Sequence, residues 1–301
     1  MNILITGGTG LLGAALIRLL RFDNEVHKLT VFTRNYAKAC RNLHASITVI
    51  DSFDEINLVD FDAIINLAGE PIVDKKWTAK RKKQIMSSRF DTTKALVAKI
   101  NSECSADKKI QFISASAVGI YGPQGAESID ETFSSFGNDF GSKLCQQWEE
   151  IATTAKHANV TLLRTGIVLS NQGGALEKMI PPFWAGFGGK ISNGKQYMPW
   201  IHVKDWARAV KFVLENKNIS GPINLSAPTP VSNKEFTHAL ATVLHRPAIL
   251  RVPRFVLRMT LGERADLIIF GQNAVPTKLL DNKFEFKYPV LADALEDLLL
   301  L

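Results

Sequence analysis

The sequence predicts an α/β protein built on a doubly wound parallel sheet, and two observations support this fold class. Short runs rich in β-branched residues alternate with longer amphipathic runs through the first half of the chain, a pattern typical of parallel sheets covered by helices. The first strand also runs directly into a glycine-rich turn and a helix. We expect strands at 2–6, 28–33, 46–50, 62–67, 109–115 and 160–165, and helices at 11–21, 35–41, 78–104 and 138–158.

The turn after the first strand predicts a dinucleotide site. Gly7, Gly10 and Gly13 stand between the apolar run 3–6 and the amphipathic run 14–21. A glycine backbone can approach a pyrophosphate closely, and a helix N-terminus offers free N–H groups and a positive dipole end. The spacing differs from the Gly-x-Gly-x-x-Gly of ordinary dehydrogenases, and a turn that only packs helix on strand is the alternative. The strand–turn–helix context, with a second strand ending about 20 residues later, favours the dinucleotide.

Arg34 follows the second strand, where dinucleotide-binding proteins recognise the ribose. An acidic residue there accepts hydrogen bonds from a 2′-hydroxyl, whereas an arginine suits a 2′-phosphate. No Asp or Glu occurs between Leu29 and Asn42, and Lys38 and Arg41 add positive charge nearby. The sequence therefore favours NADP over NAD, and a solvated turn residue is the alternative role for Arg34.

Composition and charge are those of an ordinary globular protein. The 301 residues are 46% hydrophobic with a formal net charge of +7, which suits one large domain or a main domain with a smaller partner. Cys40, Cys104 and Cys145 are far apart and odd in number, so they predict neither a disulfide framework nor a metal site. No apolar stretch is long enough to span a membrane, and no basic region precedes the first apolar run. We expect a cytoplasmic monomer or homodimer that acts on a small molecule.

A basic cluster at 75–83 surrounds Trp77 and leaves two interpretations. Basic residues interleaved with an aromatic can form a nucleic-acid patch. An apolar stripe continues from the cluster along the predicted helix 78–104, however, which favours the solvated face of a helix.

The second half of the chain changes in character. Glycine and proline become dense after residue 170, at Gly173-Gly174, Pro181-Pro182 and Gly188-Gly189, which suits an elaborated binding region. Beyond it we expect helices near 204–216 and 233–244, a strand at 223–225, and short helices with an extended piece at 284–286 in the tail.

Several segments resemble the extended short-chain dehydrogenase/reductase superfamily. They are the glycine loop 6–13, the segment Asn66-Leu67-Ala68-Gly69, and 114–122, which reads SASAVGIYG. Downstream, 164–169 (RTGIVL) and 200–205 (WIHVKD) resemble its epimerase-like branch, whose members are often labelled nucleoside-diphosphate-sugar epimerase. The tail, 261–289, is similar to that branch's C-terminal domain of unknown function. The resemblance covers the whole chain.

The resemblance implies a Rossmann domain over residues 1–170, completed by parts of 200–228, and a smaller, mainly substrate-binding domain over 171–301. It also implies which residues hold NADP. Those residues are Gly7, Gly10 and Gly13 as the phosphate loop, Thr9, Leu11 and Leu12 at the pyrophosphate, Arg34 at the 2′-phosphate, Leu67, Ala68 and Gly69 along the adenosine and ribose, and Thr165 and Gly166 at the nicotinamide.

Catalysis in this superfamily depends on a tyrosine and a lysine four residues apart. The tyrosine hydroxyl exchanges a proton with the substrate while a hydride moves to or from the nicotinamide, and the lysine lowers the tyrosine pKa and holds the ribose. A serine at the end of the fifth strand holds the substrate oxygen. Ser116 fits the serine, with Ser114 as a near alternative, and Lys143 fits the lysine, but Asp139 stands at the tyrosine position.

The missing tyrosine leaves three interpretations. Asp139 acts as a base with a pKa raised by burial, which an ion pair with Lys143 would oppose. Tyr121 supplies the phenol from the loop after the fifth strand, although we favour a packing aromatic there. In the third, the chain binds NADP without turning it over.

Other polar residues are candidates for the substrate pocket. His202 alternates with apolar residues, and Asp205 follows within a turn. This pattern suits either an acid–base pair or a histidine that bonds the backbone at a domain junction, which we favour. Glu70, Gln196 and Tyr197 have equally ordinary structural alternatives. The sequence thus predicts an NADP(H)-binding, epimerase-like oxidoreductase of an unidentified small polar substrate, a nucleotide sugar being one candidate. The alternative is an NADP-sensing binding protein with little or no activity.

Overall fold

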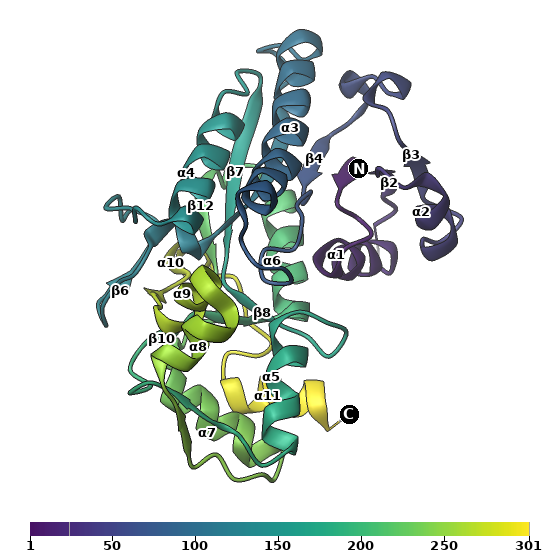
Figure 1. Cartoon of the computed structure of the whole chain (residues 1–301). Coiled ribbons are helices and arrows are strands. Elements are labelled where there is room, and N and C mark those ends of the chain that lie inside the picture. The colour runs from purple at the N-terminus through teal and green to yellow at the C-terminus, as the bar shows by residue number, and fades with distance from the viewer. Residues whose placement is uncertain (24, 301) are drawn as a thin grey trace.

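The fold is a parallel sheet covered by helices, as the sequence predicts. The computed structural model describes residues 1–23 and 25–300, and its seven-stranded central sheet has the order β12-β7-β5-β4-β1-β2-β3 (Figure 1). Every pairing in this sheet is parallel. The order reverses direction between β1 and β4, so the loops after these two strands meet at one edge. The strands are β1 (Asn2–Thr6), β2 (Lys28–Phe32), β3 (Thr48–Ile50), β4 (Ala63–Asn66), β5 (Ile110–Ala117), β7 (Ala158–Thr165) and β12 (Gly221–Leu225).

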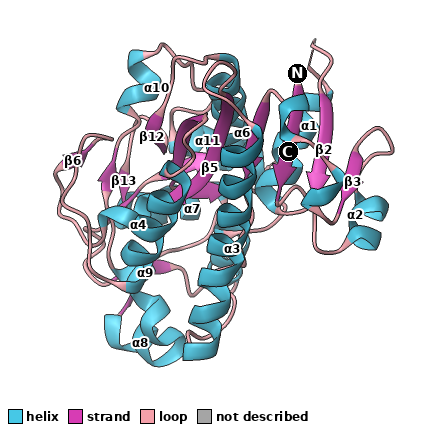
Figure 2. Ribbon diagram, turned by 90° about the horizontal axis from the view of Figure 1, so that it is seen from above, coloured by secondary structure: helices cyan, strands magenta, loops and turns pink. Residues whose placement is uncertain are grey.

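Alternate residues of the strands face two separate cores. Ile3 and Ile5 pack in the core beneath α1 (Leu11–Arg21) and α6 (Val203–Glu215), whereas Leu4 between them faces α3 (Ala79–Glu103) and α4 (Phe140–Thr153). Figure 2 shows α3 and α4 running side by side on their face of the sheet. The short α2 (Tyr36–Asn42) joins β2 to β3. Both sheet faces are therefore covered, which leaves the carboxyl edge for ligands.

The second half of the chain forms its own core at the carboxyl edge of the sheet. Figure 1 shows α5, α7 and α11 gathered below the sheet, where they share buried residues such as Trp200, Phe236 and Leu295. The helices are α5 (Ala175–Trp184), α7 (Asn233–Val243), α8 (Arg254–Leu261), α9 (Asp266–Ile269), α10 (Thr277–Asp281) and α11 (Leu291–Leu299). The short strands pair as β8 (Ile167–Leu169) with β11 (Trp200–His202), β9 (Gly189–Ile191) with β14 (Leu250–Val252), β10 (Tyr197–Met198) with β13 (Val231–Ser232), and β6 (Ser128–Ile129) with β15 (Asn273–Ala274). Single 3₁₀ turns are η1 (Phe53–Glu55), η2 (Leu58–Asp60), η3 (Val118–Tyr121) and η4 (Gly262–Ala265).

Several predicted boundaries are wrong: β3 begins at Thr48 rather than 46 and β7 at Ala158 rather than 160, and the differences in two further elements have identifiable reasons. The helix expected at 138–158 begins at Phe140, because Asp139 caps it, and ends at Thr153. His157 O already accepts from Ile110 N at 3.2 Å, so this part of the chain has joined the sheet. β5 continues to Ala117, two residues past the expected end, because Ser116 and Ala117 pair in register with Arg164 and Thr165. No helix in the described part of the chain is long and apolar enough to cross a membrane.

Candidate functional site

The turn between β1 and α1 has no room for side chains at two of its glycines. Gly7 has φ +71°, and a Cβ there would lie 2.5 Å from Leu67 O. A Cβ at Gly13 would lie 2.4 Å from Gly7 O. Gly10, at the N-cap of α1, donates its N–H to Gly7 O at 3.0 Å and offers no side chain to cap the helix. The first N–H groups of α1, at Leu11 and Leu12, are therefore left for a ligand.

Buried polar bonds fix the ends of the neighbouring strands around this turn. Thr6 Oγ1 donates to Asn66 Oδ1 at 2.7 Å and accepts from Ala68 N at 3.2 Å. Asn66 Nδ2 donates to Thr93 Oγ1 at 2.9 Å and to Ser114 Oγ at 3.3 Å. The half-buried Leu67 and Ala68 and the exposed Gly69, predicted to line the adenosine and ribose, therefore follow β4 in a fixed position beside Gly7.

The segment after β8 reaches the start of α1. A Cβ at Gly174 would lie 3.2 Å from Leu11 Cδ2, and Gln172 Oε1 accepts from Arg18 Nη2 at 3.5 Å. Thr9 is exposed at the tip of the glycine turn. The first turn of α1 carries no acidic side chain that would oppose the positive dipole end there. The exposed Thr9 and this helix start are therefore suited to an anion.

Arg34 lies at the end of β2, and the structure pairs it with Glu70. Its side chain is 75% exposed, and Nη2 donates to Glu70 Oε1 at 2.9 Å. Arg81 Nη1 donates to Glu70 Oε2 at 3.3 Å. The Arg34 bond holds the pKa of Glu70 below its ordinary value, so this carboxylate is ionised at neutral pH. Glu70, predicted as a substrate residue, contacts the predicted 2′-phosphate residue instead.

Side chains hold the backbone of the loop after β4. Four consecutive carbonyls of this loop, 70–73, each accept a hydrogen bond from a side chain, and one of the donors comes from η4 in the C-terminal half. The bonds are Arg89 Nη2 to Glu70 O at 3.1 Å, Arg81 Nη2 to Pro71 O at 2.7 Å, Trp77 Nε1 to Ile72 O at 2.8 Å, and Arg264 Nη1 to Val73 O at 2.6 Å. The loop is a fixed wall shared by the two halves of the chain.

Two residues of the basic cluster, Arg81 and Lys82, belong to this wall, whereas Lys75, Lys76, Lys80 and Lys83 are exposed. Lys82 Nζ lies 2.5 Å from Glu263 Oε2 of η4, and Arg81 is buried. Asp74 of the loop forms an ion pair with Lys178 of α5. These contacts agree with the helix-face interpretation and add a structural role for Arg81 and Lys82.

Asp139 caps α4. Its Oδ1 accepts from Ser142 N at 3.1 Å, and its Oδ2 accepts from Ser142 Oγ at 2.5 Å. A residue at the N-cap has non-helical backbone angles, so position 139 lies outside the helix that carries Lys143. The exposed Lys143 forms no side-chain bond within the described chain. The structure thus favours a cap over a base at position 139 and leaves the lysine free for a ligand.

Ser116 and Tyr121 belong to a buried network centred on Arg164. Ser116 Oγ donates to Glu149 Oε1 at 2.6 Å, and Arg164 donates to both oxygens of the same carboxylate at 2.9 and 2.8 Å. Arg164 Nη1 also donates to Tyr121 Oη at 3.1 Å, which donates to Asn224 Oδ1 at 2.7 Å. Tyr121 is fully buried, and burial raises its pKa. This arrangement supports the packing role for Tyr121 and does not favour either hydroxyl as a partner of substrate.

His202 is a buried cap at the junction of the two halves. Its Nδ1 accepts from Lys204 N at 3.0 Å, and its ring stacks on Tyr288 with centroids 4.0 Å apart. Nε2 lies 3.2 Å from Asp297 Oδ2 without the alignment of a hydrogen bond. Burial lowers the pKa of His202 to about 4, so the ring is neutral near pH 7. The structure agrees with the backbone-bonding alternative and disfavours a role in substrate binding.

The remaining predicted residues have mainly packing roles in this structure. Gln196 Nε2 reaches Ile191 O and Ile268 O at 3.4 Å each, while the half-buried Tyr197 packs its backbone against Gly271. Thr165 Oγ1 accepts from Trp206 Nε1 at 3.2 Å. A Cβ at Gly166 would lie 2.1 Å from Pro199 O, so this glycine is required for packing at the end of β7.

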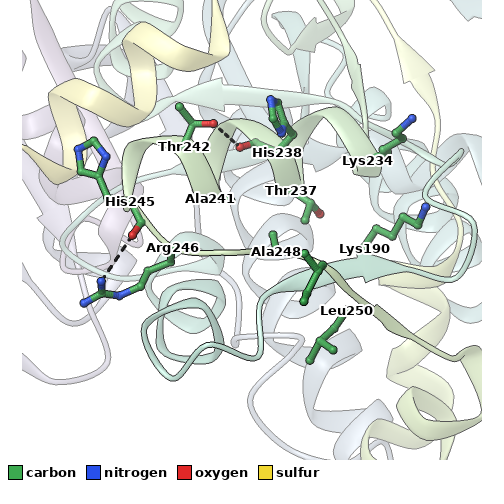
Figure 3. A pocket seen from close by; sticks show the side chains of 11 residues that line it. Lys190, Lys234, Thr237, His238, Ala241, Thr242, His245, Arg246, Ala248 and Leu250 are labelled. Atoms are coloured by element: carbon green, nitrogen blue, oxygen red, sulfur yellow. Dashed lines mark hydrogen bonds between the residues drawn. The ribbon is translucent and has the colours of Figure 1, made fainter.

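A groove of about 600 Å³ lies elsewhere, along α7 (Figure 3). Lys190, Lys234, His238, His245 and Arg246 line it, together with small and apolar residues. Figure 3 shows the basic side chains pointing in different directions rather than toward one centre. The groove therefore lacks the convergent groups of a catalytic site.

We expect replacement of His202 to change the pH dependence of stability. The unfolded histidine takes up a proton near pH 6.5, whereas folded His202 does so only near pH 4. The free energy of unfolding should fall as the pH drops from about 6.5 toward 4, by roughly 3 kcal/mol from this group, and its contribution is complete above about pH 7. His202→Asn can keep the cap but cannot titrate, so urea unfolding across this range should lose that slope. His238→Asn, on the exposed side of α7, should retain it, and an unchanged slope in His202→Asn would contradict the assignment.

Comparisons with known proteins agree with this fold. The model of the NAD dependent epimerase/dehydratase family matches residues 3–226, and a domain of unknown function (DUF1731) matches 252–298. The epimerase family protein SDR39U1 homolog, chloroplastic, of Arabidopsis thaliana is 38% identical over 98% of this chain and 86% of that protein. An epimerase family protein of Staphylococcus epidermidis is 36% identical over 98% of each.

Two solved structures are also similar. Human epimerase family protein SDR39U1 (isoform 2) with NADPH aligns with a TM-score of 0.88 and 31% identity over 99% of each chain. A nucleoside-diphosphate sugar epimerase from Corynebacterium glutamicum aligns with a TM-score of 0.75 and 28% identity over 99% of this chain and 58% of that one. With its glycine turn, its parallel sheet and its matching tail, this chain belongs to the NAD dependent epimerase/dehydratase family and has that family's NAD(P)-binding fold.

Proposed function

We propose that the chain binds NADP(H) across the carboxyl edge of the sheet, between the loops after β1 and β4. The observation that carries this proposal is the combination of a side-chain-free turn at Gly7 and Gly13 with the exposed guanidinium of Arg34 at the end of β2. The turn accepts a pyrophosphate on backbone N–H groups, and Arg34 supplies the charge for a 2′-phosphate. The NADPH in the similar human structure supports this choice of cofactor.

Each part of the edge has a role in this proposal. The backbone N–H groups of Leu11 and Leu12 at the start of α1 bind the pyrophosphate. The Arg34 guanidinium binds the 2′-phosphate, either after it releases Glu70 or while it remains bonded to Glu70. Lys143 of α4, exposed and unpaired within the described chain, binds the nicotinamide ribose. When bound, the nicotinamide would supply hydride transfer. The residues of the chain orient it and donate or accept the accompanying proton.

We propose further that the chain is an epimerase-like oxidoreductase of a small polar substrate in which Lys143, rather than a tyrosine, faces the reacting proton. Of the four predicted catalytic residues, Asp139 caps a helix, while Ser116 and Tyr121 bond within the core. Lys143 alone of these four remains unpaired within the described chain, and an ammonium group can donate a proton when a hydride reduces a carbonyl.

A second candidate function is NADP sensing, in which occupancy of the site controls a partner. The cap at Asp139 favours it, because that position no longer carries a phenol while the cofactor loop is intact. Pull-downs with and without NADPH should then differ in at least one captured protein. Capture of the same proteins under both conditions would count against NADP sensing.

We expect Arg34→Ala to weaken NADPH binding without affecting NADH. Loss of a charge-assisted contact to the 2′-phosphate should raise the Kd for NADPH roughly tenfold to a hundredfold, while NADH, which lacks this phosphate, should bind as before. Isothermal titration of both cofactors measures the difference. Arg251→Ala, an exposed arginine of β14 in the C-terminal half, is the matched control and should change neither affinity. Equal weakening of both cofactors by Arg34→Ala would contradict the proposed role.

Turnover separates the two candidate functions. A panel of carbonyl compounds and sugar nucleotides is tested, and the oxidation of NADPH is followed by its absorbance. At least one class of compound should be turned over, and Lys143→Met should lower the kcat for that class by roughly 10²-fold or more. Lys94→Met, on an exposed position of α3, should leave the rate unchanged. Bound NADPH that no class of compound oxidises would favour sensing, and full activity in Lys143→Met would exclude the proposed proton donor.

A further inference from the structure

Arg89 of α3 has a largely buried guanidinium with no carboxylate partner in the described chain. Nη1 donates to Ile85 O at 3.1 Å and reaches Ser88 Oγ at 3.5 Å, and Nη2 donates to Glu70 O at 3.1 Å. The ring of Trp148 lies 5.2 Å from Cζ. Arg164, the buried arginine of the neighbouring layer, is by contrast bound through both oxygens of Glu149. Arg89 is thus a cation with no acidic side chain in ion-pair contact among the described residues, and the Glu70 carboxylate acts on its charge only from farther away.

The hydrogen bonds of Arg89 leave part of the group unused. A guanidinium has five N–H donors in a planar fork, and the bonds to Ile85, Ser88 and Glu70 use three of them. The Nε–H and one Nη2–H have no acceptor among the described residues. Burial lowers the pKa of Arg89, yet an arginine stays protonated in proteins. A buried charge without a direct ion-pair partner is costly, and carbonyls, an aromatic face and the more distant Glu70 carboxylate offset only part of that cost.

Arg89 lies at the carboxyl edge of β4, beneath an exposed glycine. A Cβ at Gly69 would be 3.0 Å from Arg89 Cζ and 3.1 Å from Nη2, so the guanidinium packs directly under the loop after β4. Trp148 on its other side belongs to α4, the helix that carries Lys143. Arg89 therefore sits between the two elements that border the nicotinamide side of the proposed site.

The cofactor's own phosphates belong on the other side of the β1 loop. In the sheet order β5-β4-β1-β2, Arg34 follows β2 and the phosphate turn follows β1, whereas Arg89 lies at β4 and α4. A 2′-phosphate on Arg34 and a pyrophosphate at α1 leave Arg89 to a different anion.

We propose that Arg89 binds the carboxylate or phosphate of the substrate, so that the substrate of this site is an anion. This inference rests on the proposed function and deepens it by assigning a substrate class. A planar fork with unused donors suits bidentate binding of either oxyanion.

The test uses the full chain saturated with NADPH, which blocks the cofactor's phosphate sites. Sodium phosphate and sodium malonate are titrated as probes, with neutral malonamide as control, and bound NADPH fluorescence and calorimetry give the affinities. We expect saturable binding of at least one anion and none of malonamide. Arg89→Met should weaken anion binding at least tenfold, Arg89→Lys should retain part of it, and NADPH affinity should stay within about twofold. The stronger of the two anions identifies the substrate's charged group.

Arg264→Lys is the matched control, because Arg264 also donates to a carbonyl of the same loop. If Arg89 only holds the loop, the two lysine variants should affect anion binding alike, and that result would overturn the proposal. The proposal would also be overturned if neither anion binds the NADPH-saturated wild type. It would likewise be overturned if the Arg89 variants lose affinity for NADPH and for the anion to the same extent. Failure of the wild type to bind NADPH would instead refute the proposed function, so the two failures are distinguishable.

Discussion

The close approach of backbone to backbone at Gly7 and Gly13 is the constraint on which the rest of the site depends. Any side chain at Gly13 would meet Gly7 O, and any side chain at Gly7 would meet Leu67 O. The start of α1 is thereby held against both β1 and the loop after β4. Since the helix start carries the free N–H groups and the loop carries Glu70, the same two glycines set the distance between the parts of the site that we propose for the pyrophosphate and the ribose.

The loop after β4 extends this constraint into the C-terminal half. Arg264 of η4 donates to Val73 O, and Glu263 pairs with Lys82. Asp205 of α6 accepts from the backbone of Lys287 and Tyr288 at 2.9 and 2.7 Å, which ties the tail to the same core that His202 caps. The C-terminal half is thus attached to the N-terminal half through hydrogen bonds and an ion pair, and residues of both halves hold the loop after β4.

The absence of the tyrosine has a local physical explanation. A tyrosine and a lysine four residues apart face the same way only when both lie inside a helix. In this chain α4 begins at Phe140, and the aspartate before it satisfies the Ser142 N–H. Position 139 therefore stabilises the helix start, a role in which aspartate is among the best residues and tyrosine is poor.

Much of the fold follows from local sequence patterns, whereas the polar pairings do not. Periodicity predicted the central strands, and the glycine spacing predicted the turn at Gly7–Gly13. The bond between Arg34 and Glu70 joins residues 36 positions apart, and no local signal marks it. Glu149 on the buried face of α4 and Arg89 within the apolar stripe of α3 do carry a signal, a charge at a core position, but their partners become evident only in three dimensions. Ser116 was assigned from its place at a strand end, and that place could not reveal that its hydroxyl faces Glu149.

A crystal structure of the chain with NADPH would test the central claim most directly. We expect the pyrophosphate against the N–H groups at the start of α1, the 2′-phosphate at Arg34, and the nicotinamide beside Lys143 on the side of the site where Arg89 lies. Tyr121 and His202 should keep their buried partners. NADPH bound in the groove along α7, or a Tyr121 released from Asn224 to face the nicotinamide, would contradict this account of the site.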